Sequence, residues 1–202
     1  MPALIYIHGF LSSPLSHKAQ QVGEFLGKSH PNITYHCPML SAYPDEVQNS
    51  LEQLVESLLP GSVYLMGSSM GGFWATYLAE KYDLPAVLIN PAVKPTSLMP
   101  KYIGLLLKNY HTEDTYTLGS RDIETLAKIE AHTPQRLNNY WLLSQTGDET
   151  LDYQQGVDYY RGCRQTIEEG GDHGFERFER FIPAALEFCE TYDQELSTNK
   201  TL

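Results

Sequence analysis

The chain has 202 residues, of which 42% are hydrophobic and 19% are charged, and its 14 Lys and Arg against 25 Asp and Glu give a formal net charge of −11. This length and composition are those of one globular domain with a well-filled core. The negative charge disfavours nucleic acid and anionic membrane surfaces as partners, and we expect the protein to bind neither.

The predicted elements alternate between strands and helices. Apolar runs predict strands near 3–7, 33–36, 62–66, 86–90, 140–144 and 164–168, and most segments between them have helical spacing. This order is typical of a mainly parallel sheet of about six strands with helices on both faces. We expect a single domain over 1–190, with a short helical lid inserted at about 93–134, and a frayed polar tail over 191–202.

The first strand stops abruptly at His8-Gly9-Phe10. A glycine here lets the backbone turn sharply, so that the N–H of Phe10 faces the loop after the third strand. Together with the N–H of Met70, it is predicted to form an oxyanion hole, a pair of donors for a developing negative charge. His8 would lie close to this site, but we expect it to pack and hydrogen-bond within its own loop.

The third strand is followed by Gly67-Ser68-Ser69-Met70-Gly71 and then by a helix-like stretch. This is the order of a nucleophile elbow, in which the serine sits in a strained turn and larger side chains two residues away would collide. The Ser69 hydroxyl would then project above the sheet edge, near the free N–H groups of the helix. The motif alone also occurs by chance, and the strand and helix around it favour a catalytic serine.

The segment from about 93 to 134 is longer than a crossover between two strands requires. It carries apolar residues in two groups, over 98–107 and over 123–129. We expect short helices over Ser69 that enclose an apolar acyl pocket. The alternative is that the same residues simply pack on the sheet.

A serine nucleophile needs a base, and the base needs an acid that orients it. Among seven histidines, His173 lies in a loop late in the chain, after the last predicted strand, and is the predicted base. The acid should come between serine and histidine in sequence, and Asp148 directly follows the preceding strand. Asp152 is the main alternative and Glu149 a weaker one, while Asp148 is also a candidate helix N-cap.

This chemistry requires no metal or organic cofactor, and none is predicted. His30, His36 and Cys37 come nearest to a metal-binding group, but they flank the start of a strand. Cys37, Cys163 and Cys189 lack the C-x-x-C spacing of a metal site and are an odd number for a disulfide framework. With no leader-like start and no apolar run long enough to cross a membrane, we expect reduced thiols in a cytoplasmic protein.

Four motifs make the chain resemble an α/β-hydrolase: His8-Gly9-Phe10, Gly67-Ser68-Ser69-Met70-Gly71, Gly147-Asp148 and Gly171-Asp172-His173-Gly174-Phe175. More narrowly, it resembles the small bacterial YqiA-type esterases up to about Cys189, through Ile5-Tyr6-Ile7-His8-Gly9-Phe10, Ile89-Asn90-Pro91-Ala92 and Thr146-Gly147-Asp148-Glu149 followed by Leu151-Asp152-Tyr153. The resemblance implies hydrolysis of carboxylic esters or thioesters by a Ser-Asp-His triad, with Ser69, Asp148 and His173 at the matching positions.

We therefore expect a serine esterase that acts on small to medium acyl esters or thioesters through an acyl-enzyme intermediate. The elbow is shared by many acyl-transferring enzymes, so it indicates the mechanism better than the substrate. An acyltransferase with the same triad is one alternative, and competing acceptors would reveal it. A non-catalytic ligand-binding module on the same fold is the other, and it would show binding without turnover.

Overall fold

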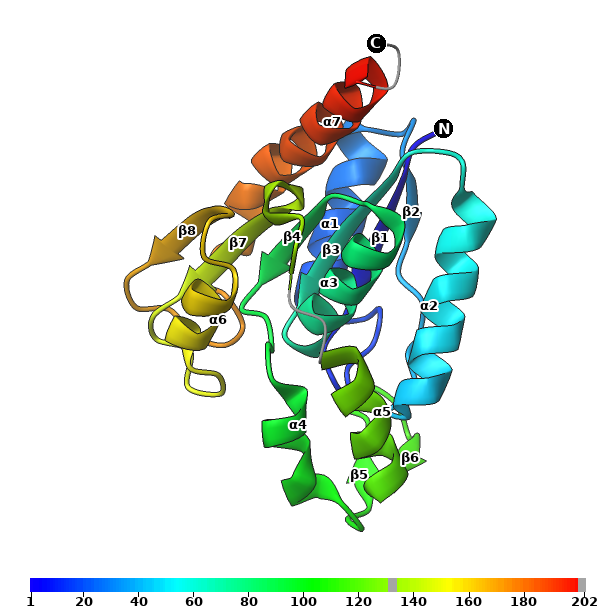
Figure 1. The fold of residues 1–202 in the computed structure, drawn as a ribbon, viewed down its shortest axis with the longest axis vertical. Helices are drawn as coiled ribbons and strands as arrows, with labels where there is room; N and C mark the ends of the chain where they lie inside the picture. Colours follow the sequence, from blue (N-terminus) through cyan, green and yellow to red (C-terminus); the bar gives the residue numbers. More distant parts are fainter. Residues whose placement is uncertain (131–133, 200–202) are drawn as a thin grey trace.

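The computed structural model describes residues 1–130 and 134–199, and its centre is a six-stranded sheet (Figure 1). The strands are β1 (Ala3–Ile7), β2 (Thr34–His36), β3 (Val63–Ser68), β4 (Ala86–Ile89), β7 (Tyr140–Gln145) and β8 (Arg164–Glu168). They lie in the order β2-β1-β3-β4-β7-β8, and every neighbouring pair is parallel. The predicted parallel sheet is confirmed.

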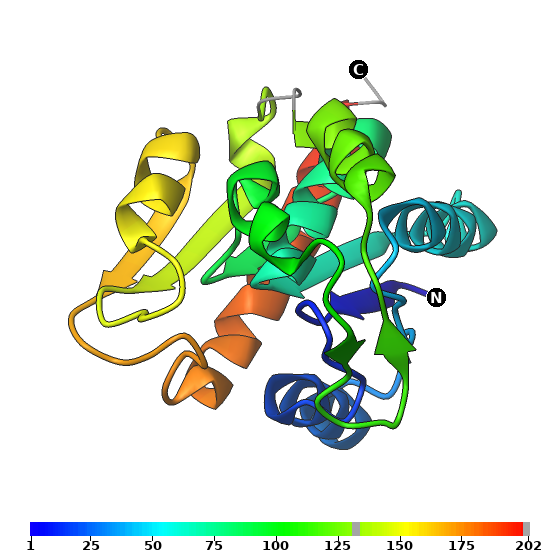
Figure 2. The ribbon, with the colours of Figure 1, turned by 90° about the horizontal axis from the view of Figure 1, so that it is seen from below.

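Helices cover both faces of the sheet (Figure 2). α1 (His17–Ser29) and α7 (Ile182–Asn199) pack on one face, and α2 (Pro44–Leu58), α3 (Met70–Tyr82) and α6 (Tyr153–Tyr159) lie on the other. Successive strand residues point to opposite faces, so β1 divides between two cores. Leu4 and Tyr6 pack with α1 and α7, whereas Ile5 and Ile7 pack with α2 and α3.

The topology leaves an opening at the carboxyl ends of β1 and β3. These strands are neighbours, but the chain leaves β1 for α1 on one face and leaves β3 for α3 on the other. In open parallel sheets, the crevice at such a switch of direction is where ligands bind. The loop at Gly9 and the turn at Ser69 therefore meet at this edge.

Between β4 and β7 the chain forms what we call the inserted segment (residues 93–130), which lies beyond the carboxyl ends of the strands (Figure 1). It contains α4 (Pro95–Leu98), the 3-10 turn η1 (Met99–Tyr102), β5 (Leu107–Lys108), β6 (Thr115–Tyr116) and α5 (Ser120–Glu130). The antiparallel pair β5–β6 was not predicted, and positions 131–133 of the predicted lid lie outside the described residues.

The inserted segment is tied at two places. Thr96 donates from its backbone N–H and its hydroxyl to Glu130 at 2.9 and 2.7 Å, which joins α4 to α5. At the other end, the side-chain amide of Asn109 donates to the Ser12 carbonyl at 2.8 Å, and the Tyr110 N–H donates to the Leu11 carbonyl at 2.8 Å. The segment is thus hydrogen-bonded to the loop that follows β1.

The end of the chain differs from the sequence-based expectation. The segment 191–202 was expected to be frayed, but α7 continues to Asn199, and 200–202 lie outside the described residues. Polar side chains anchor the helix: Tyr192 donates to Asp83 at 3.0 Å, and Ser62 donates to Asp193 at 2.6 Å.

Two further 3-10 turns, η2 (Leu137–Asn139) and η3 (Phe178–Phe181), lie in the second half of the chain. Across 1–130 and 134–199, no helix has the length and apolarity of a membrane span.

Candidate active site

Ser69 lies in the turn between β3 and α3, with backbone angles of φ 55° and ψ −123°. This region is strained for a residue with a side chain, and the surrounding packing must hold it. A Cβ at Gly67 would lie 2.2 Å from the Gly71 carbonyl oxygen, and a Cβ at Gly71 would lie 1.9 Å from the Ile7 carbonyl oxygen. Both positions therefore exclude any side chain, which is the steric reason given for the motif.

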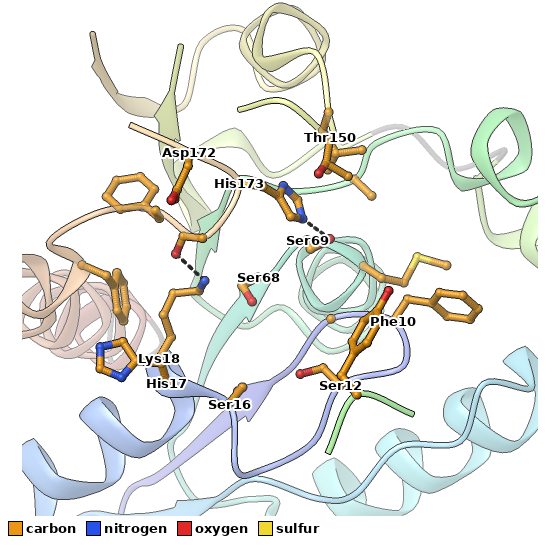
Figure 3. A pocket seen from close by; sticks show the side chains of 18 of the residues that line it. Phe10, Ser12, Ser16, His17, Lys18, Ser68, Ser69, Thr150, Asp172 and His173 are labelled. Carbon is orange, nitrogen blue, oxygen red and sulfur yellow. Dashed lines mark hydrogen bonds between the residues drawn. The ribbon is translucent and has the colours of Figure 1, made fainter. Parts of the chain in front are cut away.

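Three residues from distant parts of the sequence form a hydrogen-bonded series, of which Figure 3 shows the contact between His173 and Ser69. His173 Nε2 lies 3.0 Å from Ser69 Oγ, and His173 Nδ1 lies 2.8 and 3.0 Å from the carboxylate oxygens of Asp148. An ionised carboxylate only accepts hydrogen bonds, so Nδ1 carries the proton and Nε2 is free to accept from the serine hydroxyl. The structure brings the predicted nucleophile, base and acid together.

Asp148 is suited to remain ionised. Its side chain is only 1% exposed, and one of its oxygens accepts the backbone N–H groups of Thr150 and Leu151 at 2.9 and 2.8 Å. Burial alone would raise the pKa of the carboxyl, but the hydrogen bonds from His173, Leu151 and Thr150 outweigh it and hold the pKa below its usual value. A negative charge is thus kept beside the imidazole.

The two alternative acids are used differently. Asp152 is the N-cap of α6 and accepts the Gln154 N–H at 3.0 Å. Glu149 accepts the backbone N–H of His173 at 3.0 Å, so it contacts the histidine loop without contacting the ring. In geometry, Asp148 is the carboxylate that faces the imidazole.

Two buried amides that sequence reasoning did not assign hold the loop that carries His173. Asn90, directly after β4, is 2% exposed and donates to the carbonyls of Asp172 and His173 at 2.9 and 3.2 Å. Gln145, at the end of β7, accepts the N–H groups of Asp172 and Glu176 at 3.3 and 2.8 Å. The sequence signal is a polar residue at the carboxyl end of a buried strand.

The two residues of the predicted oxyanion hole, Phe10 and Met70, lie near Ser69. Phe10 and Met70 both line the cavity at the serine, and a Cβ at Gly9 would lie 3.4 Å from Ser69 Cβ, so the loop after β1 passes close to Ser69. Among the loop and turn hydrogen bonds of the described residues, neither the Phe10 N–H nor the Met70 N–H has a carbonyl acceptor. The oxyanion hole at these two N–H groups therefore stays a prediction.

His8 is buried, and it contacts its own loop, as expected, and also the loop after β2. Its Nδ1 lies 3.0 Å from the Gly9 carbonyl oxygen, and its Nε2 accepts the Leu40 N–H at 3.3 Å. Burial lowers the pKa of the ring, which favours the neutral form. Both nitrogens are engaged, so His8 fixes the turn that presents Phe10.

A cavity of about 720 Å³ opens beside Ser69. One part of its wall is mainly apolar, with Phe10, Met70, Leu98, Met99, Tyr102 and Leu151. Another part comes from the start of α1, the loop before η3 and η3 itself, and carries the polar residues Lys18, Gln21, Asp172, Glu176 and Glu179. Figure 3 shows Lys18 and Phe10 on opposite sides of Ser69. Ser69 thus lies between two surfaces of different character.

The inserted segment contributes only part of its apolar residues to this cavity. Leu98, Met99 and Tyr102 line it, and the ring of Tyr102 contacts the ring of Phe10 with centroids 5.7 Å apart. Leu105 and Leu106 instead are 52% and 76% exposed. No set of three His, Cys, Asp or Glu side chains within the described residues is arranged to hold a metal ion.

Residues 3–190 match the profile of a family described as an uncharacterised protein family, UPF0227. The chain belongs to this family. Its fold is also that of known α/β-hydrolases. Est1E from Butyrivibrio proteoclasticus superposes with a TM-score of 0.72 at 15% sequence identity, covering 96% of this chain and 88% of that one.

Two further solved structures agree with this UPF0227 member in fold. Alpha/beta hydrolase domain-containing protein 10 from mouse gives a TM-score of 0.66 at 18% identity, covering 97% of this chain and 90% of that one. A monoacylglycerol lipase from Paleococcus ferrophilus gives 0.64 at 14% identity, covering 94% of each chain. The chain therefore has the α/β-hydrolase fold, as the resemblance stated from the sequence implied.

Proposed function

We propose that this protein is a serine hydrolase that cleaves carboxylic esters or thioesters of small to medium acyl groups. The observation that carries the proposal is the series from Ser69 Oγ through His173 to Asp148, with a 3.0 Å contact at the serine and a 2.8 Å contact at the acid. A serine hydroxyl becomes an effective nucleophile when a positioned base takes its proton, and this series supplies the base.

The reaction follows from these contacts. Ser69 Oγ attacks the acyl carbonyl carbon while His173 Nε2 accepts the hydroxyl proton, and Asp148 stabilises the resulting imidazolium. As the tetrahedral intermediate collapses, its bond to the leaving oxygen or sulfur breaks, and His173 gives the proton to that atom. Water then attacks the acyl-enzyme with His173 again as base, which releases the acid and restores Ser69.

The backbone N–H groups of Phe10 and Met70 are the proposed donors to the oxyanion. They lie on the loop after β1 and at the start of α3, and the partial positive charge of a helix N-terminus adds to their effect. Removing one such donor in a hydrolase typically costs a factor of about 10²–10³ in rate. Because these donors belong to the backbone, side-chain substitution at Phe10 tests packing more than hydrogen bonding.

The proposed acyl size rests on the cavity. A volume of about 720 Å³ lies within the range of about 300–1,000 Å³ of small-molecule sites. Leu98, Met99 and Tyr102 bound its apolar part, so a chain of limited length would be buried there. The structural neighbours include esterases and lipases, which supports acyl-ester chemistry on this fold.

The test is hydrolysis of p-nitrophenyl butyrate by the wild type and by Ser69→Ala, each checked for folding by circular dichroism and thermal unfolding. Ser69→Ala should lower kcat by at least about a thousandfold. Ser57→Ala, on the exposed side of α2, removes a hydroxyl far from the cavity and should leave the rate unchanged. Equal rates in the wild type and Ser69→Ala would disprove the assignment of the nucleophile.

A further inference from the structure

Lys18, at the start of α1, places an ammonium group in the wall of the same cavity as Ser69 (Figure 3). Its Nζ donates to the carbonyl of Gly174, the residue after His173, at 2.6 Å. An ammonium has three N–H donors. Among the described residues, the Gly174 carbonyl is the acceptor for one of them. Lys18 belongs to none of the ion pairs among the described residues.

The surroundings of Lys18 favour a bound anion. Burial lowers the pKa of Lys18, and the charges of Asp172 and Asp148 oppose this effect only in part. The ammonium is thus partly withdrawn from water. In such a partly buried place, its attraction to an opposite charge is less screened than at the surface. A cation therefore faces one part of the cavity.

The position of Lys18 indicates which part of a substrate it would contact. Its bond to Gly174 places it on the His173 side of Ser69, opposite Phe10 (Figure 3). In the proposed reaction the histidine gives its proton to the leaving group, so the leaving group occupies the histidine side. The apolar wall on the side of Phe10 remains for the acyl chain.

We propose that Lys18 is a specificity-determining residue that binds a carboxylate carried by the leaving alcohol or thiol of the substrate. This inference rests on the proposed hydrolase function and names its substrate class: an apolar acyl group joined to an anionic alcohol or thiol.

The acidic residues at the rim limit the charge of that group. Asp172, Glu176 and Glu179 also line the cavity, and all three are exposed. Glu179 accepts a hydrogen bond from Gln21 at 3.2 Å, which holds it beside α1. These carboxylates repel a polyanion more strongly than a single carboxylate, so the site favours a group with one negative charge.

A matched pair of esters tests the proposal: 4-carboxyphenyl butyrate and 4-carbamoylphenyl butyrate have nearly the same shape and differ by one charge. Lys18→Gln keeps a donor for the Gly174 carbonyl but removes the charge, and Lys18→Arg keeps the charge. Lys28→Gln is the control, since Lys28 lies on the same helix, is 76% exposed and pairs with Glu24. For each variant, kcat/KM is measured on both esters.

We expect the wild type to prefer the carboxy ester. Lys18→Gln should lower kcat/KM at least tenfold on the carboxy ester, mainly through KM, and less than threefold on the carbamoyl ester. Lys18→Arg should retain the preference, and Lys28→Gln should behave as the wild type. Equal losses on both esters, which a purely structural role at Gly174 would give, overturn the proposal, as does a wild type without preference.

Binding separates this inference from the proposed function. In the Ser69→Ala background, calorimetry compares the affinity of the carboxy and carbamoyl esters with and without Lys18→Gln. The wild type could turn over neither ester while binding still shows a charge preference that depends on Lys18. That outcome contradicts the hydrolase function and supports the carboxylate site. Turnover of both esters with no dependence on Lys18 does the reverse.

Discussion

The side-chain amide of Asn90 donates to the backbone carbonyl of His173 at 3.2 Å. A residue at the end of β4 thereby holds the loop of the proposed base, although it contacts neither the imidazole nor Ser69 in the hydrogen bonds of the described residues. Asn90 is therefore a positioning residue for the loop of the proposed base.

Asn90→Ala should lower kcat by about tenfold to a hundredfold with little change in KM, because a base displaced by about 1 Å loses much of its effect. It should also cost about 1–3 kcal/mol in the free energy of unfolding, since buried partners lose their hydrogen bonds. Steady-state kinetics and denaturant unfolding measure both quantities.

Asn139→Ala is the matched control for Asn90. Asn139 is 3% exposed and donates to Asp83 and the Leu84 carbonyl, away from the cavity. We expect a similar loss of stability with an unchanged kcat. Equal effects of the two variants on kcat would show that Asn90 has no specific role in positioning the base.

Asp148 and Asp152, two of the acidic candidates, should differ in their effect on turnover. Asp148→Asn should lower kcat by about 10³–10⁴, the scale of an acid removed from a Ser-His-Asp series. Asp152→Asn should leave kcat within about threefold and keep the cap of α6, because Asn is as good an N-cap as Asp. A larger loss in Asp152→Asn than in Asp148→Asn would reverse the assignment.

The low pKa of Asp148 has a consequence for stability. A carboxyl whose pKa is lower in the folded state stabilises the fold fully above its unfolded value, about 3.9, and loses this contribution as pH falls through the folded value. The difference in unfolding free energy between the wild type and Asp148→Asn should therefore be constant from about pH 7 to 5. Below about pH 4 the wild type should lose stability relative to the variant. Denaturant unfolding at several pH values measures this difference, and a difference that does not change below pH 4 would contradict it.

Two glycines should respond to alanine in opposite directions. Gly71→Ala would place a Cβ 1.9 Å from the Ile7 carbonyl oxygen and should prevent the native turn, with a loss of more than about 3 kcal/mol. Gly27→Ala, on an exposed position of α1 with no atom within 4 Å of the new Cβ, should stabilise the protein by about 0.5–1 kcal/mol. Thermal unfolding of the two variants gives the comparison.

Several features could be predicted because their signals are local. The sheet strands are apolar runs bounded by turns, and Ser69, Asp148 and His173 each follow a strand, so parallel topology brings them to one edge. The role of Asn90 depends on a loop 82 residues away, which no local pattern reveals.

Other features depend on partners that become visible only in three dimensions. β5 and β6 have two residues each, too few for a period of alternation. The segment after position 190 is polar and reads as a tail, but Asp83 and Ser62 provide partners for its side chains. Tertiary contacts here override local composition.

The attachment of the inserted segment to the loop after β1 couples two parts of the proposed reaction. Asn109 and Tyr110 are bonded to Ser12 and Leu11, which directly follow Phe10. A substrate that pushes the inserted segment outward therefore also displaces the loop after β1, which carries the proposed oxyanion donor, the N–H of Phe10. An oversized acyl chain should then be turned over slowly even when it binds, so that discrimination against it is expressed in rate and not only in affinity.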